Sequence, residues 1–221
     1  MSSRDIILNK IKASLQNTSR VPDDPDVDEK IASSLKDITP DSLNGLVEQF
    51  RKELEIVAGE FLSAKNEKET LPLVRTVFAE TKFSSFTSTS RPLPARIANA
   101  LKNDFSYTSS EQVDGRKTAL ATMDIGIVDV DFAVAESGTL AVSFHQLNST
   151  LPHFLPDVII ALVYKDQLLA NLYELFSKID IESAKDMTLI TGPSRTADIE
   201  KILILGAHGP RRLVVIMIDE R

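Results

Sequence analysis

The chain has 221 residues, of which 43% are hydrophobic and 26% are charged, and its net charge is −7. This composition can bury the core of one large domain, or of one domain with an appended arm. The excess of acidic residues disfavours a nucleic-acid surface, which needs clustered Lys and Arg to displace counterions. The chain has no cysteine, which excludes disulfides, thiolate catalysis, and zinc or iron–sulfur sites built from Cys ligands.

The sequence carries no signal for a membrane or for export. No apolar run approaches the roughly 20 residues that span a bilayer, and the first residues, Met1 to Asp5, lack the apolar core of a signal peptide. We therefore expect a cytoplasmic protein without a membrane span. His145, His153 and His208 show no metal-ligand spacing, so no metal site is expected.

The first forty residues predict an N-terminal arm. Ile7, Leu8, Ile11 and Leu15 recur at helical spacing, which predicts a short amphipathic helix over residues 4–17. Residues 18–40 contain prolines and an acidic run, which is typical of an extended polar linker. We interpret residues 1–40 as an arm that docks on the body or on a second copy, which would make a homo-oligomer; a frayed terminus is the alternative.

Residues 41–221 predict one domain in which helices and strands alternate. Apolar residues from Leu43 to Leu62 keep a helical period after a start signal at Asp41 or Ser42. Further helices are expected over 67–80 and 92–102, and short strands over 83–88 and 105–108. This alternation predicts βα units on a parallel sheet.

The densest strand signals lie in the second half of the chain. Residues 125–135 and 139–144 are apolar and β-branched, and residues 158–164 form the continuous apolar run of a strand buried on both faces. A helix is expected over 167–179 and strands over 187–191 and 213–218, while 199–205 fit a strand or a helical turn. The predicted fold is therefore α/β, a mainly parallel sheet with flanking helices and a helical N-terminal arm.

Two polar turns, Gly192–Glu200 and Gly206–Pro210, suggest a ligand site. Ligands bind outside the carboxyl ends of strands in open α/β sheets, and the first turn directly follows the strand expected at 187–191. Arg195 can hold a carboxylate or phosphate with two parallel hydrogen bonds, and hydroxyls and backbone N–H groups can donate to the same anion. The residues predicted to bind this ligand are Gly192, Ser194, Arg195, Thr196, Asp198, Gly206 and Gly209. The alternative is an N-capped turn, with Thr196 or Asp198 as the cap and Arg195 paired with a structural acid.

Glu136 and His208 are the candidate catalytic residues. His208 could bind an anionic substrate or transfer protons near neutral pH, or could instead satisfy buried carbonyls. Glu136 lies on the turn Glu136-Ser137-Gly138, where a carboxylate can act as nucleophile, base or acceptor. The alternative is a tight connection that needs Gly138, with Glu136 in solvent.

Three other polar residues carry weaker signals. Asp129 and Asp131 alternate with apolar residues, so we interpret one or both as solvated positions on one face of a strand. His153 lies in a proline-bounded loop and could line the same pocket. No Walker loop, dinucleotide glycine fingerprint, nucleophile elbow or His-Glu-x-x-His motif is present.

The segments at 131–140, 192–200 and 206–210 together resemble the LUD domain, and specifically the lactate-utilisation protein C (LutC/YkgG) family. The long string Gly-Pro-Ser-Arg-Thr-Ala-Asp-Ile-Glu carries most of this resemblance, which covers roughly residues 41–221. The departures are small, with Ser137 where Thr is common and Ala207 where Val is common. Neither departure removes a candidate functional group.

The resemblance implies a fold like that of the NagB/RpiA/CoA-transferase group. It also implies a role in oxidising L-lactate to pyruvate together with iron–sulfur partner subunits, with no cofactor bound by this chain. A small anionic metabolite is the expected ligand. Two alternatives remain open: a self-sufficient enzyme acting on an acyl-CoA or phosphosugar through Glu136, and a small-molecule sensing module on the same fold.

Overall fold

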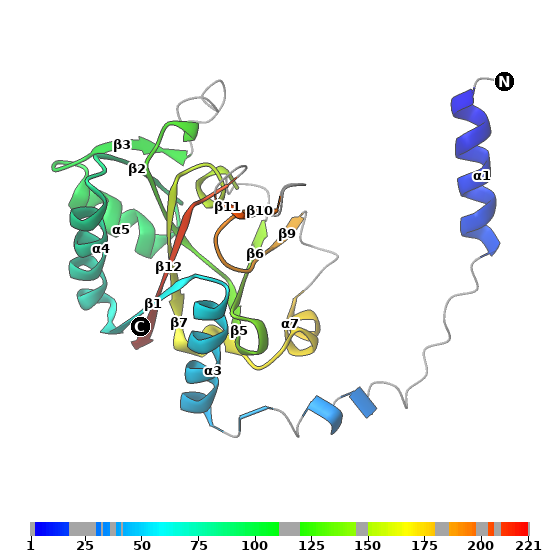
Figure 1. Ribbon diagram of the computed structural model, residues 1–221, viewed down its shortest axis with the longest axis horizontal. Coiled ribbons are helices and arrows are strands. Elements are labelled where there is room, and N and C mark those ends of the chain that lie inside the picture. Colours follow the sequence, from blue (N-terminus) through cyan, green and yellow to red (C-terminus); the bar gives the residue numbers. More distant parts are fainter. Residues whose placement is uncertain are drawn as a thin grey trace. The chain divides into compact units, whose positions relative to one another are not determined.

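A computed structural model describes residues 3–17, 30–31, 33–35, 39–40, 42–110, 120–144, 150–179, 186–197, 203–205 and 209–220. The chain divides into two compact units, Met1–Thr39 and Pro40–Arg221. The first unit contains α1 (Ser3–Asn17), which confirms the helix predicted there (Figure 1). Lys30, Ile31 and residues 33–35 are helical, so the prediction of an extended linker is wrong at those positions.

The second unit contains α-helices and two main sheets. The helices are α3 (Leu43–Ile56), α4 (Glu67–Thr81), α5 (Pro92–Leu101) and α7 (Leu172–Lys178). The strands of the larger sheet are β1 (Glu60–Asn66), β2 (Ser85–Ser88), β3 (Ser106–Ser109), β4 (Ile125–Asp129), β7 (Val158–Tyr164) and β12 (Arg212–Glu220). The smaller sheet contains β5 (Phe132–Val134), β6 (Thr139–Phe144), β8 (Leu168–Leu169) and β9 (Asp186–Ile190). A separate hairpin pairs β10 (Arg195–Ala197) with β11 (Leu203–Leu205).

The larger sheet is parallel throughout, in the order β1-β12-β7-β4-β2-β3. This confirms the predicted α/β fold with a mainly parallel sheet. After β2 the chain forms β3, which lies beside β2 at one edge of the sheet. After β4 it forms β7, which lies beside β4 on the side away from β2. The neighbouring strands β2 and β4 therefore flank a topological switch point, the usual place for a ligand site in such sheets.

The sheet is covered on both faces, as the continuous apolar run of β7 predicts. On one face Ile160, Val214 and Ile127 pack against α4 and α5. On the other face Ile159 and Val215 pack against α3 and the smaller sheet. Figure 1 shows α4 and α5 on one side of β12, with the smaller sheet and α7 on the other side.

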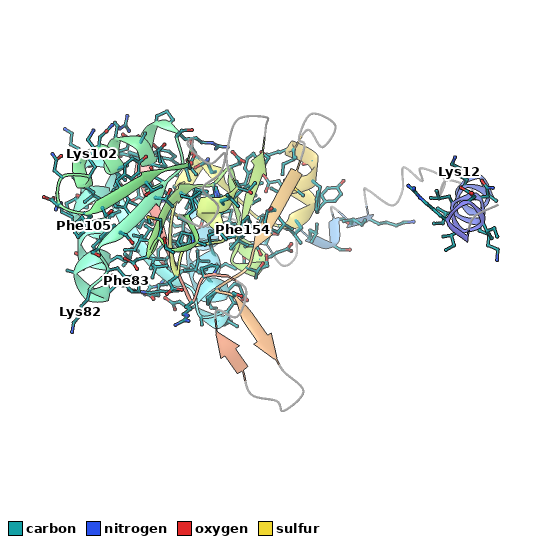
Figure 2. All side chains as sticks on the ribbon, turned by 90° about the horizontal axis from the view of Figure 1, so that it is seen from above. Lys12, Lys82, Phe83, Lys102, Phe105 and Phe154 are labelled. Atoms are coloured by element: carbon teal, nitrogen blue, oxygen red, sulfur yellow. The ribbon has the colours of Figure 1, made fainter. Side chains whose placement is uncertain are left out.

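Aromatic residues close the α4 side of this layered structure. The ring of Phe78 on α4 lies 5.6 Å from Phe86 on β2 and 4.5 Å from Phe105, which precedes β3. Phe83 and Phe105 lie at the same side of the unit (Figure 2). Such edge and tilted ring contacts add to the apolar burial that holds α4 on the sheet.

The smaller sheet was not predicted, and two interpretations are corrected by it. Residues 125–135 are not one strand, because the chain leaves the parallel sheet after Asp129 and enters the smaller sheet at Phe132. The strand expected at 187–191 is present as β9, but it pairs antiparallel with β6. The turn at Gly192 therefore does not follow a strand of the parallel sheet.

Two helix boundaries also differ from the sequence prediction. The helix that starts at Leu43 ends at Ile56 rather than near Leu62, because Ala58 takes a φ of 62° and the Gly59 N–H donates to the Leu54 carbonyl at 2.8 Å. The helix expected over 167–179 begins only at Leu172, after the short strand β8. In both places a strand lies next to the helix, and the apolar pattern runs through both elements. The pattern alone therefore cannot mark the boundary between them.

Candidate functional site

Four polar residues meet at the switch point. Asp129 is the last residue of β4, and Asp131 follows two positions later. Thr89 and Arg91 follow β2, and the Thr89 N–H donates to the Ile127 carbonyl at 3.1 Å, which fixes this loop against β4. We call Thr89, Arg91, Asp129 and Asp131 the switch-point cluster.

The two aspartates of this cluster share one guanidinium nitrogen. Arg91 Nη1 lies 2.6 Å from Asp131 Oδ1 and 3.1 Å from Asp129 Oδ2. Thr89 Oγ1 donates to Asp129 Oδ1 at 2.7 Å. The exposed fractions are 27% for the Arg91 side chain and 18% and 19% for those of Asp129 and Asp131. The interpretation of the two aspartates as solvated strand positions is therefore wrong, because both are largely buried and paired.

The electrostatics of the two carboxylates differ. Burial raises the pKa of Asp129 above its ordinary value, and this effect outweighs the opposing contributions of Arg91 and Thr89. Burial also opposes ionisation of Asp131, but hydrogen bonds from Arg91 and Ser143 outweigh it and lower the pKa of Asp131. Burial acts against the charge of Arg91, yet its two carboxylate partners raise its pKa. Asp129 is therefore the more easily protonated member of the pair.

The smaller sheet and the end of β7 hold the cluster in place. Asp131 Oδ2 accepts hydrogen bonds from the backbone N–H and the hydroxyl of Ser143, at 2.6 and 2.7 Å. Gln167 Nε2 donates to the carbonyls of Val130 and Asp131, both at 3.0 Å, and its side-chain oxygen accepts from the Tyr164 N–H at 2.7 Å. The segment that crosses between the two sheets is thus tied on both sides.

His153 lies behind the cluster and is 2% exposed. Its Nε2 is 3.4 Å from the Asp129 carbonyl oxygen. Burial lowers the pKa of His153 to about 4, so the ring is neutral near neutral pH. The sequence suggested that His153 could line the pocket formed by the two glycine turns; its Nε2 contacts the end of β4, and a place in that pocket stays a prediction.

A cavity of about 340 Å³ opens beside the cluster and is lined by Arg91 and Asp129. Across it, Glu67 at the start of α4 accepts hydrogen bonds from the Tyr164 hydroxyl and from Arg96 on α5. Glu67 and Arg96 also line an adjoining cavity of about 360 Å³. Volumes of roughly 300–1,000 Å³ are typical of small-molecule sites, so the switch point can hold a small polar ligand.

The described parts of the two predicted glycine turns lie close together. The Ser194 N–H donates to the Pro210 carbonyl at 2.8 Å, and a Cβ placed on Gly209 would lie 3.1 Å from Ser194 Cβ. The N–H groups of Arg211 and Arg212, at the start of β12, donate to the Asp157 carbonyl just before β7. This turn pair, which we define as residues 192–194 and 209–210, therefore lies at the amino ends of the parallel strands, opposite the switch point.

The close approach that Gly192 permits is to the protein itself. Gly192 has a φ of 79°, and a Cβ added there would lie 2.6 Å from the Val57 carbonyl oxygen at the end of α3. Its position therefore has a packing explanation in addition to the predicted role in ligand binding. Arg195 and Thr196 lie on β10, in register with Leu205 and Ile204. Asp198, Gly206 and His208 lie outside the described residues, so their predicted roles stay predictions.

Glu136 contacts a helix rather than the turn pair. Its Oε1 accepts a hydrogen bond from the Leu172 N–H at 2.7 Å, in the first turn of α7, where a carboxylate is stabilised by the helix dipole. Gly138 has a φ of 61°, and a Cβ there would lie 2.4 Å from the Leu54 backbone nitrogen on α3. The hydroxyls of Thr139 and Thr191 lie 2.8 Å apart and connect this turn to the residue before Gly192. The catalytic role of Glu136 stays a prediction.

Sequence reasoning missed Arg91 and Thr89 as site residues. One signal was available. Arg91 lies shortly after a predicted strand and directly before Pro92, and Asp129 lies at the end of another strand. The information that was lacking is that these two strands are neighbours in the sheet.

Among the residues that the structure describes, no group of three or more His, Asp or Glu side chains is placed to hold a metal ion.

The comparisons with known proteins agree with this architecture. The family model of the LUD domain matches residues 47–218, which is most of the second unit. The chain belongs to the LUD domain family. This confirms the resemblance inferred from the three sequence segments. No helix within the described ranges is long and apolar enough to cross a membrane.

Curated relatives of this LUD domain chain share one name. "Lactate utilization protein C" of Bacillus pumilus (strain SAFR-032) is 37% identical over 100 residues, which is 42% of either chain. The protein of the same name from Halalkalibacterium halodurans is 33% identical over 104 residues, covering 44% of this chain and 45% of its own length. The match thus spans less than half the length of these relatives.

A solved structure shares the fold. The crystal structure of a DUF162 family protein from Deinococcus radiodurans superposes with a TM-score of 0.59 at 17% sequence identity. The superposition covers 81% of this chain and 99% of that protein. At this identity the likeness shows a common fold and carries no statement about chemistry.

Proposed function

We propose that this LUD domain protein takes part in L-lactate utilisation as a subunit that carries no redox centre of its own. The observation that carries the proposal is the set of relatives named lactate utilization protein C, which match at 30–37% identity. The family fold alone would not support it, because one fold serves many functions.

The cysteine count supports the non-redox part of the proposal. Iron–sulfur clusters are held almost entirely by Cys thiolates, and this chain has none. If lactate is oxidised to pyruvate with the help of iron–sulfur clusters, those clusters belong to partner subunits. The role of this chain is then to assemble with those subunits, to bind a small anion, or both.

The turn pair is the proposed anion site of this subunit. The approach of Ser194 to Gly209 supports it, because the described parts of the two segments that contain the predicted ligand-binding residues lie side by side. The hydroxyl of Ser194, together with an Arg on the adjoining strand, suits a carboxylate. Arg195 on β10 is the residue expected to contribute most to this binding.

Growth and co-purification test the proposed function together. Deleting the coding region should abolish growth on L-lactate and leave growth on glucose unchanged, and the full-length chain should restore it. A tagged chain from lactate-grown cells should recover proteins that contain iron–sulfur clusters, measured as iron and acid-labile sulfide. Normal growth of the deletion strain on L-lactate would reject the role in lactate utilisation, and recovery of the chain without any iron would reject the partner assignment.

A further inference from the structure

The described residues that line the cavity at the switch point carry charges of both signs in equal number. Arg91 and Arg96 contribute two positive charges, and Glu67 and Asp129 contribute two negative charges. Leu93 and Leu162 add apolar surface to the same wall. A wall of this kind suits a small ligand that has an anionic group, a hydrogen-bond donor and a short apolar part.

Arg91 lines the cavity and has donors that no described residue occupies. Both aspartates contact the same nitrogen, Nη1, at 2.6 and 3.1 Å. Among the described residues, none accepts a hydrogen bond from its Nε or Nη2. Two neighbouring N–H groups of a guanidinium match the two oxygens of a carboxylate, and Arg91 remains part-exposed and accessible to one.

Asp129 can accept one more donor close to Arg91. An ionised carboxylate offers about four lone-pair positions, and the oxygens of Asp129 accept from Thr89 Oγ1 and Arg91 Nη1. A ligand hydroxyl next to a carboxylate could therefore donate to Asp129 while its carboxylate contacts Arg91. The first residues of α5, which include Leu93, would cover the apolar part of the ligand.

We propose that this cavity binds a small hydroxycarboxylate, with its carboxylate on Arg91 and its hydroxyl donating to Asp129. The site is inferred from the cavity and its charges alone. The choice of a hydroxyl rather than an ammonium as the donor rests on the proposed function in lactate utilisation. The site is separate from the turn pair, which lies at the opposite end of the parallel strands.

A titration of the full chain followed by ¹H–¹⁵N NMR tests the proposal. Sodium L-lactate should produce saturable shifts at the backbone amides of Thr89, Leu93 and Val130. Propionate has the same carbon skeleton but no hydroxyl, so it should bind at least about tenfold more weakly, because one hydrogen bond to a charged group is lost. L-Alanine has an ammonium in place of the hydroxyl and should bind more weakly than L-lactate.

Variants sharpen the assignment to Arg91. Arg91→Lys keeps the charge but loses the planar pair of donors, so the Kd for L-lactate should rise at least about tenfold. Arg75→Lys, at an exposed ion pair with Asp104, is the matched control and should leave the Kd unchanged. The titrations of the unmodified chain decide the proposal even where Arg91→Lys does not fold.

Three results would overturn the proposal. Shifts confined to residues 192–194 and 209–211 would place the ligand in the turn pair, and no saturable shift at tens of millimolar L-lactate would remove the site. Tighter binding of L-alanine would reject a hydroxycarboxylate as the ligand. A failure of the proposed function is distinguishable, since normal growth on L-lactate together with saturable binding would reject the cellular role and leave the site intact.

Discussion

The two ends of the parallel sheet satisfy their polar groups in different ways. At the carboxyl end, the switch-point cluster does so with side chains, since Arg91 bridges Asp129 and Asp131 and hydroxyls complete the carboxylates. At the amino end, the turn pair does so with backbone, through the Ser194 N–H and the Pro210 carbonyl. The first arrangement borders a cavity, and the second packs closely against itself and against α3.

This difference shows how glycines and charges should be weighed as site signals. Gly138 and Gly192, both with positive φ, lie against the backbone of α3 at Leu54 and Val57. Close packing of one element on another therefore explains both glycines without a ligand. Largely buried charges beside a cavity are the stronger indication of a site, because burial is costly unless the arrangement is used or fully paired.

The largest expected effect comes from removing the cation of the switch-point cluster. Arg91→Met leaves two largely buried carboxylates without their partner and should lower the free energy of unfolding by about 3 kcal/mol. This value is at the low end of the range for broken buried pairs, because these side chains are partly exposed. Urea unfolding at neutral pH measures it. Arg75→Met, at a pair whose side chains are 45% and 49% exposed, is the control and should cost less than about 1 kcal/mol. Equal effects of the two variants would mean that the cluster behaves as a surface pair.

A second prediction concerns the pH dependence contributed by His153. Its pKa is about 4 in the folded protein and about 6.5 when unfolded. The unfolded state therefore binds more protons in this window, so the contribution of His153 to stability is present above pH 6.5 and is lost as the pH falls toward 4. Between pH 7.5 and 4.5, the wild type should lose about 2.5 kcal/mol more than His153→Gln. Parallel losses in both proteins would show that His153 is protonated as easily in the folded state.

The third prediction tests whether the turn pair is held by packing. Gly192→Ala should destabilise the protein by about 2 kcal/mol, because it combines an unfavourable φ with a contact to the Val57 carbonyl. Gly209 does not have a positive φ and has only side-chain neighbours within 3.4 Å, so Gly209→Ala should cost less than about 1 kcal/mol. Thermal unfolding measures both. A small effect at Gly192 together with lost anion binding would instead favour the predicted ligand role.

Much of the fold follows from local patterns in the sequence. The continuous apolar run of β7 and the prolines that open α5 predict elements that the structure confirms. The helix α4 begins at the predicted residue, where Asn66 accepts the N-terminal hydrogen bond from Lys68. Helical and strand periodicities are local properties, so they can be read without knowledge of the neighbours.

The parts that were not predicted depend on long-range pairing. Residues 125–135 look like one strand, and only the pairing of Phe132 with Ala141 shows that the chain enters a second sheet. Likewise, β9 was expected in the parallel sheet because nothing local distinguishes it from a parallel strand. The contact of Arg91 with Asp131, forty residues away, follows from β2 lying next to β4. The candidate site at the switch point could therefore not be predicted from spacing alone.

The smallest expected effect is at Glu136, and it separates a structural role from a chemical one. Glu136→Gln keeps a side-chain oxygen that can accept from the Leu172 N–H, so the free energy of unfolding should fall by less than about 1 kcal/mol. Glu136→Ala removes the acceptor and should cost about 1–2 kcal/mol, as at other helix N-termini. If the carboxylate only supports α7, Glu136→Gln should complement growth on L-lactate fully, whereas loss of complementation by this stable variant would show that the charge itself is used in the chemistry.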